Sequence, residues 1–479
     1  MAYFTYGEFK MKMEPWDHQL HALRYLYPRD CGALYTPPGS GKTKVIIDLI
    51  VNRGFKRIVI VAPKVPCSDV WPKEIKKHSD IPKDCVHHLY AMSGKKKAEY
   101  LKQFKKPRPD DPPQIFIVNY DSVWREPARR VWFYKALGID CAICDESHKI
   151  KSPSSKCSAF LAQLAKRVPH RYAMTGTPLA ENPTDVYAQY RFIDRNIFGT
   201  NFGIFCNYYE NVDVEATARA GFKILDAQTP YKNLDDLREK MFSCAFQMES
   251  TVLLPPTSKK LYKVPMDDTL QELYHQMLEE GAVEMGDGFL TIDNVLSSVI
   301  RLQQLTSGYL PLEYDDGTKS LDRVSTYRRT ALLKLIRTLP EDEPLVIFGR
   351  FRKDLYSIRK VAERLGCGYS EVSGSENTLA EWQEGKTRII GVQYGAGVEG
   401  IDLTRACICI FYSIDHSLMK HDQAIKRIHR PGQTRPCTYY YVVATQDTGG
   451  KTIDQKIQLA LKHKKDFVDL VMKGEKSLK

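Results

Sequence analysis

Residues 36–43 read Thr-Pro-Pro-Gly-Ser-Gly-Lys-Thr, and residues 139–148 read Ile-Asp-Cys-Ala-Ile-Cys-Asp-Glu-Ser-His. The first stretch follows a short apolar run and opens a helical pattern, which predicts a loop that binds phosphate through backbone N–H groups and a helix N-terminus. Lys42 would contact the β- and γ-phosphates of a nucleotide, and the Thr43 hydroxyl would bind Mg²⁺. The N–H groups nearest the phosphates would be those of Gly39, Ser40 and Gly41. The alternative interpretation is an ordinary glycine-rich turn.

The second stretch is a nearly continuous apolar run that ends at two neighbouring acids, Asp145 and Glu146. Ligands of an open α/β sheet lie at the carboxyl ends of its strands, so both side chains would emerge beside a bound nucleotide. Asp145 suits coordination of Mg²⁺ through water, and Glu146 suits the general base that activates an attacking water. A solvated acidic turn is the other interpretation, which the phosphate loop upstream disfavours. Together the two stretches predict a nucleoside triphosphate hydrolase site.

Around these stretches, short apolar runs alternate with helical segments, which indicates βαβ units. A second alternating region starts near Tyr327, and helical patterns dominate between the two regions. The fold class is therefore α/β, with two doubly wound parallel-sheet lobes, helical protrusions between them and a C-terminal helix. The expected strands are 57–63, 114–120 and 139–144 in the first lobe, and 344–348, 387–392 and 407–412 in the second. The expected division is 1–267 for the first lobe with a helical protrusion at about 183–250, 268–328 for a helical protrusion and linker, 329–450 for the second lobe, and 451–479 for a C-terminal helix packing back on the core.

Two segments of the second lobe suit contact with phosphates. Residues 395–404 are glycine-rich and follow an expected strand, so they could meet a nucleic-acid backbone or line a nucleotide cleft. A flexible loop is the alternative. Arg427 and Arg430 are expected one helical turn apart, where guanidinium groups could stabilise a transferring phosphoryl group. The alternative is a basic surface helix, which is the commoner location of two arginines at this spacing. Arginines supplied from a second lobe would make hydrolysis depend on lobe closure.

Composition limits the class of protein and its surroundings. The net charge of +12 favours an anionic partner such as nucleic acid, although solubility alone is the other explanation. No apolar run is long enough to cross a membrane, and residues 1–6 lack a secretory signal. Cys141 and Cys144 are interpreted as core thiols in a reducing cytosol. A lysine-rich segment at 95–108 is interpreted as solvated surface in preference to a DNA-guiding loop.

The order of these motifs resembles that of the superfamily 2 helicases, and their details resemble its Swi/Snf-like branch. The motifs are Gln19, Gly-Ser-Gly-Lys-Thr at 39–43, Asp-Glu-Ser-His at 145–148, Met-Thr-Gly-Thr-Pro at 174–178, Gly-Ile-Asp-Leu-Thr at 400–404 and Gln-x-x-x-Arg-Ile-His-Arg-Pro-Gly-Gln at 423–433. The chain is more similar to the small phage and bacterial members than to chromatin remodellers. The resemblance implies two RecA-like lobes with ATP between them and DNA across both. It implies a monomeric DNA-dependent ATPase that uses ATP and Mg²⁺, tracks along double-stranded DNA of any sequence, and works in the cytoplasm of a bacterial or phage-infected cell.

Positions that match the family motifs take their roles from the resemblance. Gln19 would read the adenine, and Gly400 and Asp402 would lie near the ribose and the lobe interface. His148, Thr175 and Thr177 would couple the nucleotide state to the grip on DNA. The hydrolytic set would be Lys42, Asp145, Glu146, Gln423, Arg427 and Arg430, with Gly39, Ser40, Gly41 and Thr43 also holding the nucleotide, and Thr43 and Asp145 the metal. The DNA contacts would be Lys64, Asn119, Tyr120, Arg350, Gly395 and Gly397.

Three functions stay open at this point. The first is an ATP-driven translocase that moves along duplex DNA and remodels DNA or protein–DNA complexes. The second is a strand-separating or branch-migrating helicase on DNA or RNA. The third is a nucleotide-switched DNA-binding scaffold, which an intact Lys42, Glu146 and Arg430 argue against. Thr36 in place of the loop's first glycine, Asp402 in place of the branch's frequent Asn, and Glu399 in a loop expected to face DNA set the chain apart from the remodellers.

Overall fold

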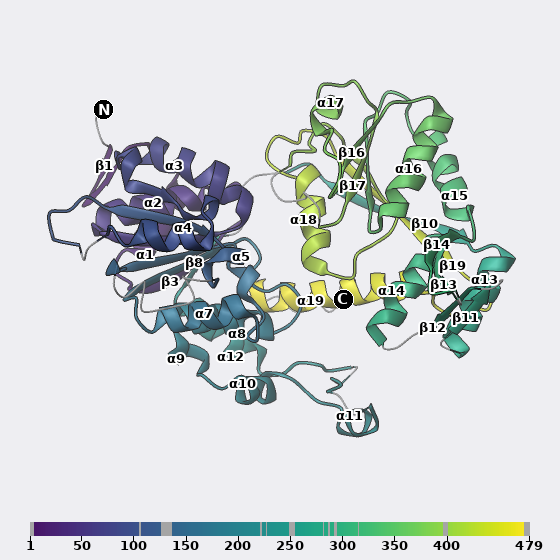
Figure 1. Cartoon of the computed structure of the whole chain (residues 1–479), viewed down its shortest axis with the longest axis horizontal. Coiled ribbons are helices and arrows are strands. Elements are labelled where there is room, and N and C mark those ends of the chain that lie inside the picture. The colour runs from purple at the N-terminus through teal and green to yellow at the C-terminus, as the bar shows by residue number, and fades with distance from the viewer. Residues whose placement is uncertain are drawn as a thin grey trace. The chain divides into compact units, whose positions relative to one another are not determined.

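The computed structural model describes residues 4–104, 107–125, 137–220, 223–226, 228–248, 254–280, 282–285, 288–291, 295–314, 316–395 and 401–473. The chain forms two compact units (Figure 1). The first unit comprises Met1–Thr251 and Asp466–Lys479, and the second comprises Val252–Lys465. Each unit is built on its own parallel sheet, which confirms the expected fold class.

The first unit contains a seven-stranded sheet in the order β5-β6-β4-β7-β8-β3-β9, and each pair of neighbours is parallel. Alternate residues of β4 enter opposite cores, Val59 and Val61 on one face and Ile58 and Ile60 on the other. Burial on both faces explains why such strands are almost wholly apolar. The strands are β3 (Cys31–Tyr35), β4 (Arg57–Ala62), β5 (Val86–His88), β6 (Gln114–Asn119), β7 (Cys141–Asp145), β8 (His170–Thr175) and β9 (Ala245–Gln247).

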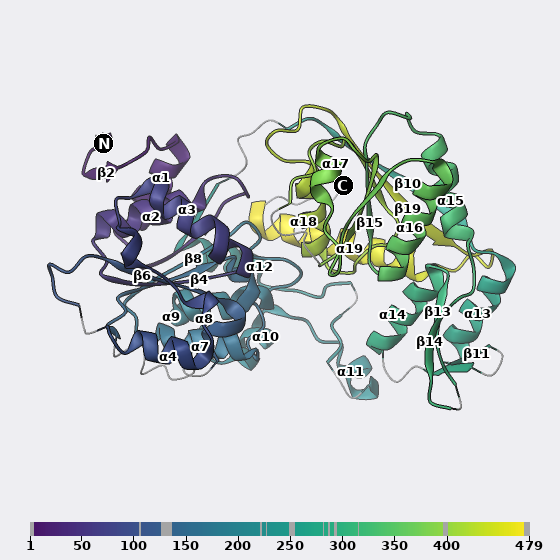
Figure 2. The same ribbon diagram turned by 45° about the horizontal axis from the view of Figure 1, so that its top comes forward.

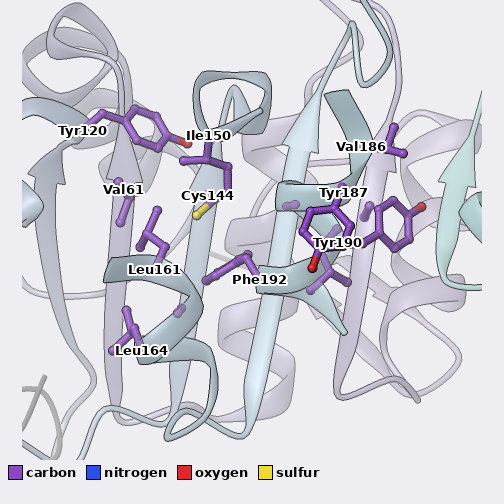
Figure 3. Close-up of a cluster of buried hydrophobic side chains, with 14 of the residues drawn as sticks. Val61, Tyr120, Cys144, Ile150, Leu161, Leu164, Val186, Tyr187, Tyr190 and Phe192 are labelled. Carbon is purple, nitrogen blue, oxygen red and sulfur yellow. The ribbon is translucent and has the colours of Figure 1, made fainter. Parts of the chain in front are cut away.

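Helices cover both faces of this sheet (Figures 1 and 2). One face carries α1 (Asp17–Leu26), α2 (Lys42–Arg53) and α3 (Trp71–His78). The other carries α4 (Gly94–Leu101), α5 (Tyr120–Val123), α7 (Lys156–Ala165), α8 (Thr184–Ile193) and α12 (Leu234–Phe242). Figure 3 shows part of this second core, where Tyr187 and Tyr190 of α8 lie with Leu161 and Leu164 of α7. The smaller elements are β1 (Phe4–Tyr6), β2 (Phe9–Met11), α9 (Arg195–Phe198), α10 (Phe202–Tyr209) and α11 (Val214–Ala220), with a π-helix at Pro66–Val70 and 3-10 turns at Lys83–Cys85, Leu89–Ala91 and Ser147–Ile150.

The second unit contains a six-stranded sheet in the order β10-β19-β18-β15-β17-β16, again parallel between neighbours. Its strands are β10 (Thr257–Pro265), β15 (Leu345–Gly349), β16 (Tyr369–Val372), β17 (Ile389–Gln393), β18 (Ile408–Phe411) and β19 (Cys437–Thr445). Helices α15 (Tyr327–Arg337) and α16 (Arg352–Leu365) pack on one face, where Ile347 and Ile410 are buried. Phe411 packs against His421 of α18 (Leu418–Ile428), and α17 (Leu379–Gln383) buries Trp382.

Beside this sheet lies a smaller layer with a four-stranded antiparallel sheet, β11-β12-β13-β14. It is formed by α13 (Asp268–Glu279), β11 (Ala282–Met285), β12 (Gly288–Thr291), α14 (Val295–Thr306), β13 (Tyr309–Tyr314) and β14 (Lys319–Arg323). The expectation that 268–328 is helical was therefore wrong for these four strands. They are short and carry charged or polar residues, so the sequence lacks the continuous apolar runs of the parallel sheets.

Two further expectations about the organisation need correction. The lobe boundary was expected after residue 267, but β10 pairs along its whole length with β19 and belongs to the second unit. β10 is an edge strand with exposed lysines, so its sequence does not resemble a buried strand. The region at about 183–250 is not simply a protrusion, because α8 and α12 pack into the first unit's core and β9 extends its sheet.

Helix α19 (Ile453–Lys473) lies within the range expected for the C-terminal helix and supplies residues to both units. In the second unit, its buried Asp454 forms an ion pair with Arg328 of α15. Further along, Phe467 and Val471 join the core of the first unit. All twelve cysteines lie in described residues and are free, and Cys141 and Cys144 are buried as expected. Among the described residues, no helix combines the length and apolarity that a membrane crossing requires.

A buried histidine gives the second unit a predictable response to acid. His421 lies against Phe411, and its Nε2 is 3.0 Å from the hydroxyl of Tyr441. The pKa of His421 is lowered from 6.5 to about 3, chiefly by burial and then by the charges of Lys259 and Lys465, while Asp415 opposes the shift. Between pH 6.5 and about 3, the unfolded chain therefore binds a proton at His421, whereas the folded unit keeps this residue neutral. Stability that is present above pH 6.5 is lost as the pH falls toward 3.

We expect the free energy of unfolding to fall by about 1.4 kcal/mol per pH unit in this window through His421 alone. His421→Phe, which keeps a ring against Phe411, should reduce that slope. The measurement is thermal or urea unfolding from about pH 4.5 to 7. The exposed His463 of α19 provides the control, His463→Phe. Equal acid sensitivity in both variants would contradict the assignment.

Candidate active site

The loop after β3 is already shaped for a phosphate chain. Gly39 and Gly41 have φ of 82° and 77°, in the left-handed region that glycine tolerates. A Cβ on Gly41 would come within 2.2 Å of Nε2 of Gln19, so a larger residue there would strain the backbone and displace the glutamine side chain. The Nζ group of Lys42 donates to the carbonyls of Thr36 at 3.0 Å and Pro37 at 3.2 Å. These carbonyl oxygens hold the ammonium group at the loop, where phosphate oxygens could replace them.

Thr36 occupies the position of the loop's usual first glycine and contributes a contact that glycine could not make. Its hydroxyl is 2.8 Å from the hydroxyl of Ser40, so the two side chains close the loop from inside. Gln19 of α1 supports the same turn, because its Nε2 donates to the Ser40 carbonyl at 3.1 Å and its Oε1 accepts from the Trp16 N–H at 3.0 Å. His18 also reaches the Ser40 carbonyl, at 2.8 Å. Gln19 is thus placed at the phosphate loop, and its reading of adenine stays a prediction.

The acidic pair lies at the end of β7. Asp145 is 6% exposed, and burial raises the pKa of its carboxyl, with the charge of Glu146 adding to the effect. The indole N–H of Trp71 donates to Oδ2 of Asp145 at 2.9 Å. Glu146 has φ of 51°, an unfavourable value for a residue with a Cβ. Such strain concentrates at functional sites, and here it turns the chain sharply after Asp145.

The three expected coupling residues all contact the Glu146 region. His148 Nδ1 lies 3.3 Å from Oε2 of Glu146, 3.0 Å from the Thr175 hydroxyl and 3.5 Å from the Thr177 hydroxyl. Thr175 also donates to Glu146 Oε2 at 3.2 Å. Burial opposes ionisation of Glu146, but the hydrogen bond and charge of His148 outweigh it and lower the pKa of Glu146. The carboxylate is therefore ionised at neutral pH, as a base that accepts a proton from water must be.

The sheet order explains why these residues meet. β8 lies between β7 and β3, so Thr175 at its end falls between the acidic pair and the phosphate loop. A buried glutamine of α8, Gln189, accepts from the Ser147 hydroxyl at 2.7 Å and donates to the Pro178 carbonyl at 2.7 Å. It fixes the loop after β8 to the segment that follows Glu146. No sequence motif marks Gln189, which resembles any other polar position in a helix.

The second unit brings its own site residues together. Burial raises the pKa of Asp402, but hydrogen bonds from Thr404 and the charges of Arg430 and Arg427 outweigh it, so that the pKa is lowered. Gln433 donates to the carbonyls of Thr404 at 3.1 Å and Ala406 at 2.8 Å, which fixes the segment after Asp402 to the segment after α18. Gly397 and Gly400 lie outside the described residues.

The arginines differ from expectation in one respect. Helix α18 ends at Ile428, and His429 has non-helical angles, so Arg427 is helical while Arg430 lies in the turn beyond it. They were expected one helical turn apart on the same helix. The buried face of α18 is formed by Leu418, His421, Ala424 and Ile428. Gln423 and Arg427, four residues apart and only partly buried, lie together on a different face.

The expected DNA contacts follow strand ends in both units. Lys64 is exposed after β4, Asn119 ends β6, Arg350 follows β15 and Gly395, with φ of 85°, follows β17. Tyr120 needs correction, because its side chain is 8% exposed and its hydroxyl donates to the Asp145 carbonyl at 2.7 Å. The ring lies in the core, with the hydroxyl turned toward Ile150 (Figure 3). The side chain of Tyr120 therefore supports the acidic pair and is unavailable to nucleic acid.

A parallel sheet with a phosphate loop and an acidic pair, followed by a second parallel sheet with paired arginines, defines the helicase-type nucleoside triphosphatases of superfamily 2. Residues 18–307 match the SNF2-related domain, and residues 328–432 match the helicase conserved C-terminal domain. The chain belongs to the SNF2-related family and is a DNA-dependent ATPase of superfamily 2. The expected family and enzyme class are confirmed.

Individual proteins are similar at low identity. "Putative protein p41" of Acyrthosiphon pisum secondary endosymbiont phage 1 is 22% identical over 463 residues, which are 91% of this chain and 93% of that protein. "DNA repair and recombination protein RDH54" of Saccharomyces cerevisiae is 24% identical over 76% of this chain, but the match spans only 40% of the yeast protein. The Sulfolobus solfataricus SWI2/SNF2 ATPase core, solved in complex with dsDNA, aligns with a TM-score of 0.41 and 17% identity, covering 98% of this chain and 96% of that one.

Proposed function

We propose that this protein hydrolyses ATP with Mg²⁺ to move along duplex DNA and to remodel DNA or protein–DNA complexes. The proposal is carried by the position of Lys42, Asp145 and Glu146 at one edge of the first unit's sheet, where they would form the hydrolytic set. The arginines of the second unit supply what that set lacks, a mobile positive charge for the transition state.

The residues present suit Mg²⁺. Thr43 and Asp145 offer hard oxygen donors, and the described residues include no cluster of three or more His, Cys, Asp or Glu side chains that could hold a metal alone. Mg²⁺ is usually held by one or two carboxylates together with substrate phosphates, so this sparse donor set fits. Bound there, the ion would neutralise charge on the β- and γ-phosphates.

Hydrolysis divides among the residues by their chemistry. Lys42 attracts the β- and γ-phosphates, and the backbone N–H groups of the loop orient them. Glu146, whose carboxylate is held by His148 and Thr175 at the distances given above, accepts a proton from the attacking water. Arg427 and Arg430 stabilise the charge that develops on the transferred phosphoryl group. Because these arginines belong to the second unit, turnover requires both units to engage the nucleotide.

Contact with DNA is proposed through its phosphates. Lys64 and Arg350, with the backbone N–H groups near Asn119 and Gly395, follow the carboxyl ends of strands in each unit. Phosphate contacts carry no sequence information and are sensitive to salt. Alternate closing and opening of two units that hold one strand would convert ATP turnover into displacement. We further propose a monomer acting in the cytoplasm of a bacterial or phage-infected cell, which the similarity to a phage protein supports.

We expect ATP-dependent release of the third strand from a DNA triplex and little separation of a forked duplex under the same conditions. A motor that follows phosphates of an intact duplex displaces what lies in its path without melting base pairs. Gel separation of labelled strands measures both products, with Glu146→Gln as the hydrolysis-deficient control. Efficient fork unwinding without triplex release would favour the strand-separating helicase. ATPase assays with duplex DNA, single-stranded DNA and RNA identify the activating nucleic acid.

A further inference from the structure

Two aromatic side chains hold Asp145 from different directions. The indole N–H of Trp71 donates to its carboxylate at 2.9 Å, and the hydroxyl of Tyr120 donates to its main-chain carbonyl at 2.7 Å. Both rings are buried, Trp71 at 0% and Tyr120 at 8% exposed. The side chain and the backbone of this one acid are therefore each fixed by an aromatic donor.

Trp71 directly follows the segment that carries the exposed Lys64. β4 ends at Ala62, Lys64 and Val65 are exposed, and a π-helix at Pro66–Val70 leads straight into α3, which Trp71 begins. The backbone N–H of Trp71 closes the π-helix by donating to the Pro66 carbonyl. Single π-turns are rare and frequently mark functional sites. Lys64 and the buried indole are therefore only seven residues apart, with the π-helix between them.

Tyr120 directly follows Asn119, the second expected DNA contact of this unit, much as Trp71 follows the segment that carries Lys64. Asn119 ends β6, and Tyr120 is the first residue of α5. In the sheet, β6 pairs with β4 and β4 pairs with β7, with Ala62 opposite Asn119 and Val61 opposite Cys144. The ends of the three strands therefore lie level at one edge. Each proposed DNA segment reaches Asp145 through the aromatic residue that directly follows it.

We propose that Trp71 and Tyr120 are positioning residues through which engagement of DNA at Lys64 and Asn119 sets the geometry of Asp145, and with it the metal requirement of hydrolysis. The inference rests on the proposed roles of Asp145 in holding Mg²⁺ and of these segments in holding DNA. Partners of metal ligands are worth about 10- to 100-fold in metal affinity or activity, because they fix the ligand's orientation. An indole N–H can orient a carboxylate without neutralising it, which suits this task.

The test uses conservative variants with matched controls. Trp71→Phe removes the donor and part of the ring, and Trp382→Phe makes the same change at a buried indole that donates to the Arg388 carbonyl at 3.2 Å in the second unit. Tyr120→Phe removes only a hydroxyl, and Tyr172→Phe does so at a buried tyrosine whose hydroxyl donates to the Arg29 carbonyl at 2.7 Å. Phosphate release is measured against Mg²⁺ concentration, with and without duplex DNA, and DNA affinity is measured without nucleotide.

We expect Trp71→Phe to raise the Mg²⁺ concentration for half-maximal turnover by about 10-fold and to reduce the stimulation by DNA. Tyr120→Phe should reduce the stimulation by DNA with a smaller change in the Mg²⁺ requirement, because it acts on the backbone of Asp145. DNA affinity should stay native in both, since Lys64 and the backbone donors remain. Both controls should retain the native Mg²⁺ dependence and DNA stimulation.

Native Mg²⁺ dependence and native stimulation in both test variants would overturn the inference, as would equal changes in the controls. A loss of DNA affinity that accounts for the lost stimulation would also overturn the inference, because the two residues would then act only in DNA binding. If Trp71→Phe does not fold, Tyr120→Phe decides the question. If DNA fails to stimulate the native protein, the proposed function fails, and the Mg²⁺ titration still tests whether Trp71 positions Asp145.

Discussion

Glu146→Gln is expected to lower ATP turnover on the order of 10³-fold while ATP binding persists, because a positioned general base contributes about 10²- to 10⁴-fold. Glutamine keeps the shape and one acceptor oxygen, so the contacts of Oε2 with His148 and Thr175 have a substitute. The amide cannot accept the proton of the attacking water. Steady-state phosphate release in saturating DNA measures the loss, and titration with a fluorescent ATP analogue measures binding.

A matched control is available on the same unit. Glu215 of α11 is 89% exposed at its side chain, so Glu215→Gln makes the same chemical change away from the site. It should leave turnover and nucleotide affinity at native values. Near-normal turnover in Glu146→Gln would show that another group accepts the proton, and loss of ATP binding would show that the residue holds the nucleotide.

Arg430→Ala is expected to lower kcat on the order of 10³-fold, the effect typical of removing an arginine finger. Nucleotide affinity should change little, because the phosphate loop lies in the first unit and Arg430 in the second. Arg430 reaches the Ile401 carbonyl only at 3.5 Å, so the second unit loses little support when the side chain is removed. Arg427→Ala should act in the same direction.

The exposed Arg337 in the last turn of α15 serves as the control for lost positive charge. Arg337→Ala should keep native kcat and ATP affinity. An equal loss of binding and turnover in Arg430→Ala would argue that the arginine holds the ground state. Unchanged turnover would remove Arg430 from the hydrolytic set and leave Arg427 as its candidate.

The parts predicted well from the sequence are those whose chemistry is local. A phosphate loop needs glycines and a lysine at fixed spacing, and an acidic pair must end a buried strand, so Lys42, Asp145 and Glu146 can be located from the sequence, while their catalytic roles stay predictions. Strands such as β4 and β7 are buried on both faces and therefore stand out as apolar runs. Other buried strands of the two sheets show the same apolar pattern, which is why the fold class could be predicted from the sequence.

The parts missed depend on partners that are distant in the chain. β10 carries exposed lysines because it is an edge strand, and only its pairing with β19 identifies it. Trp71 lies 74 positions from Asp145, and nothing in the composition around it indicates a hydrogen bond to a carboxylate. Tyr120 was expected to contact DNA because it matches a family motif, but the direction of a side chain at a strand-to-helix turn is decided by packing. Motifs locate a site, whereas its supports come from tertiary structure.

Helix α19 has a consequence for how the protein is made. Synthesis proceeds from the N-terminus, so residues 1–251 leave the ribosome well before Phe467 and Val471, which complete their core. Until then Tyr231, whose ring lies 4.5 Å from that of Phe467, has no partner at that position, and Gln247 lacks the Met472 carbonyl it donates to at 3.0 Å. The unit that carries the phosphate loop is finished only after the whole second unit has been translated. A nascent or interrupted chain therefore lacks part of the core of the unit that carries the phosphate loop.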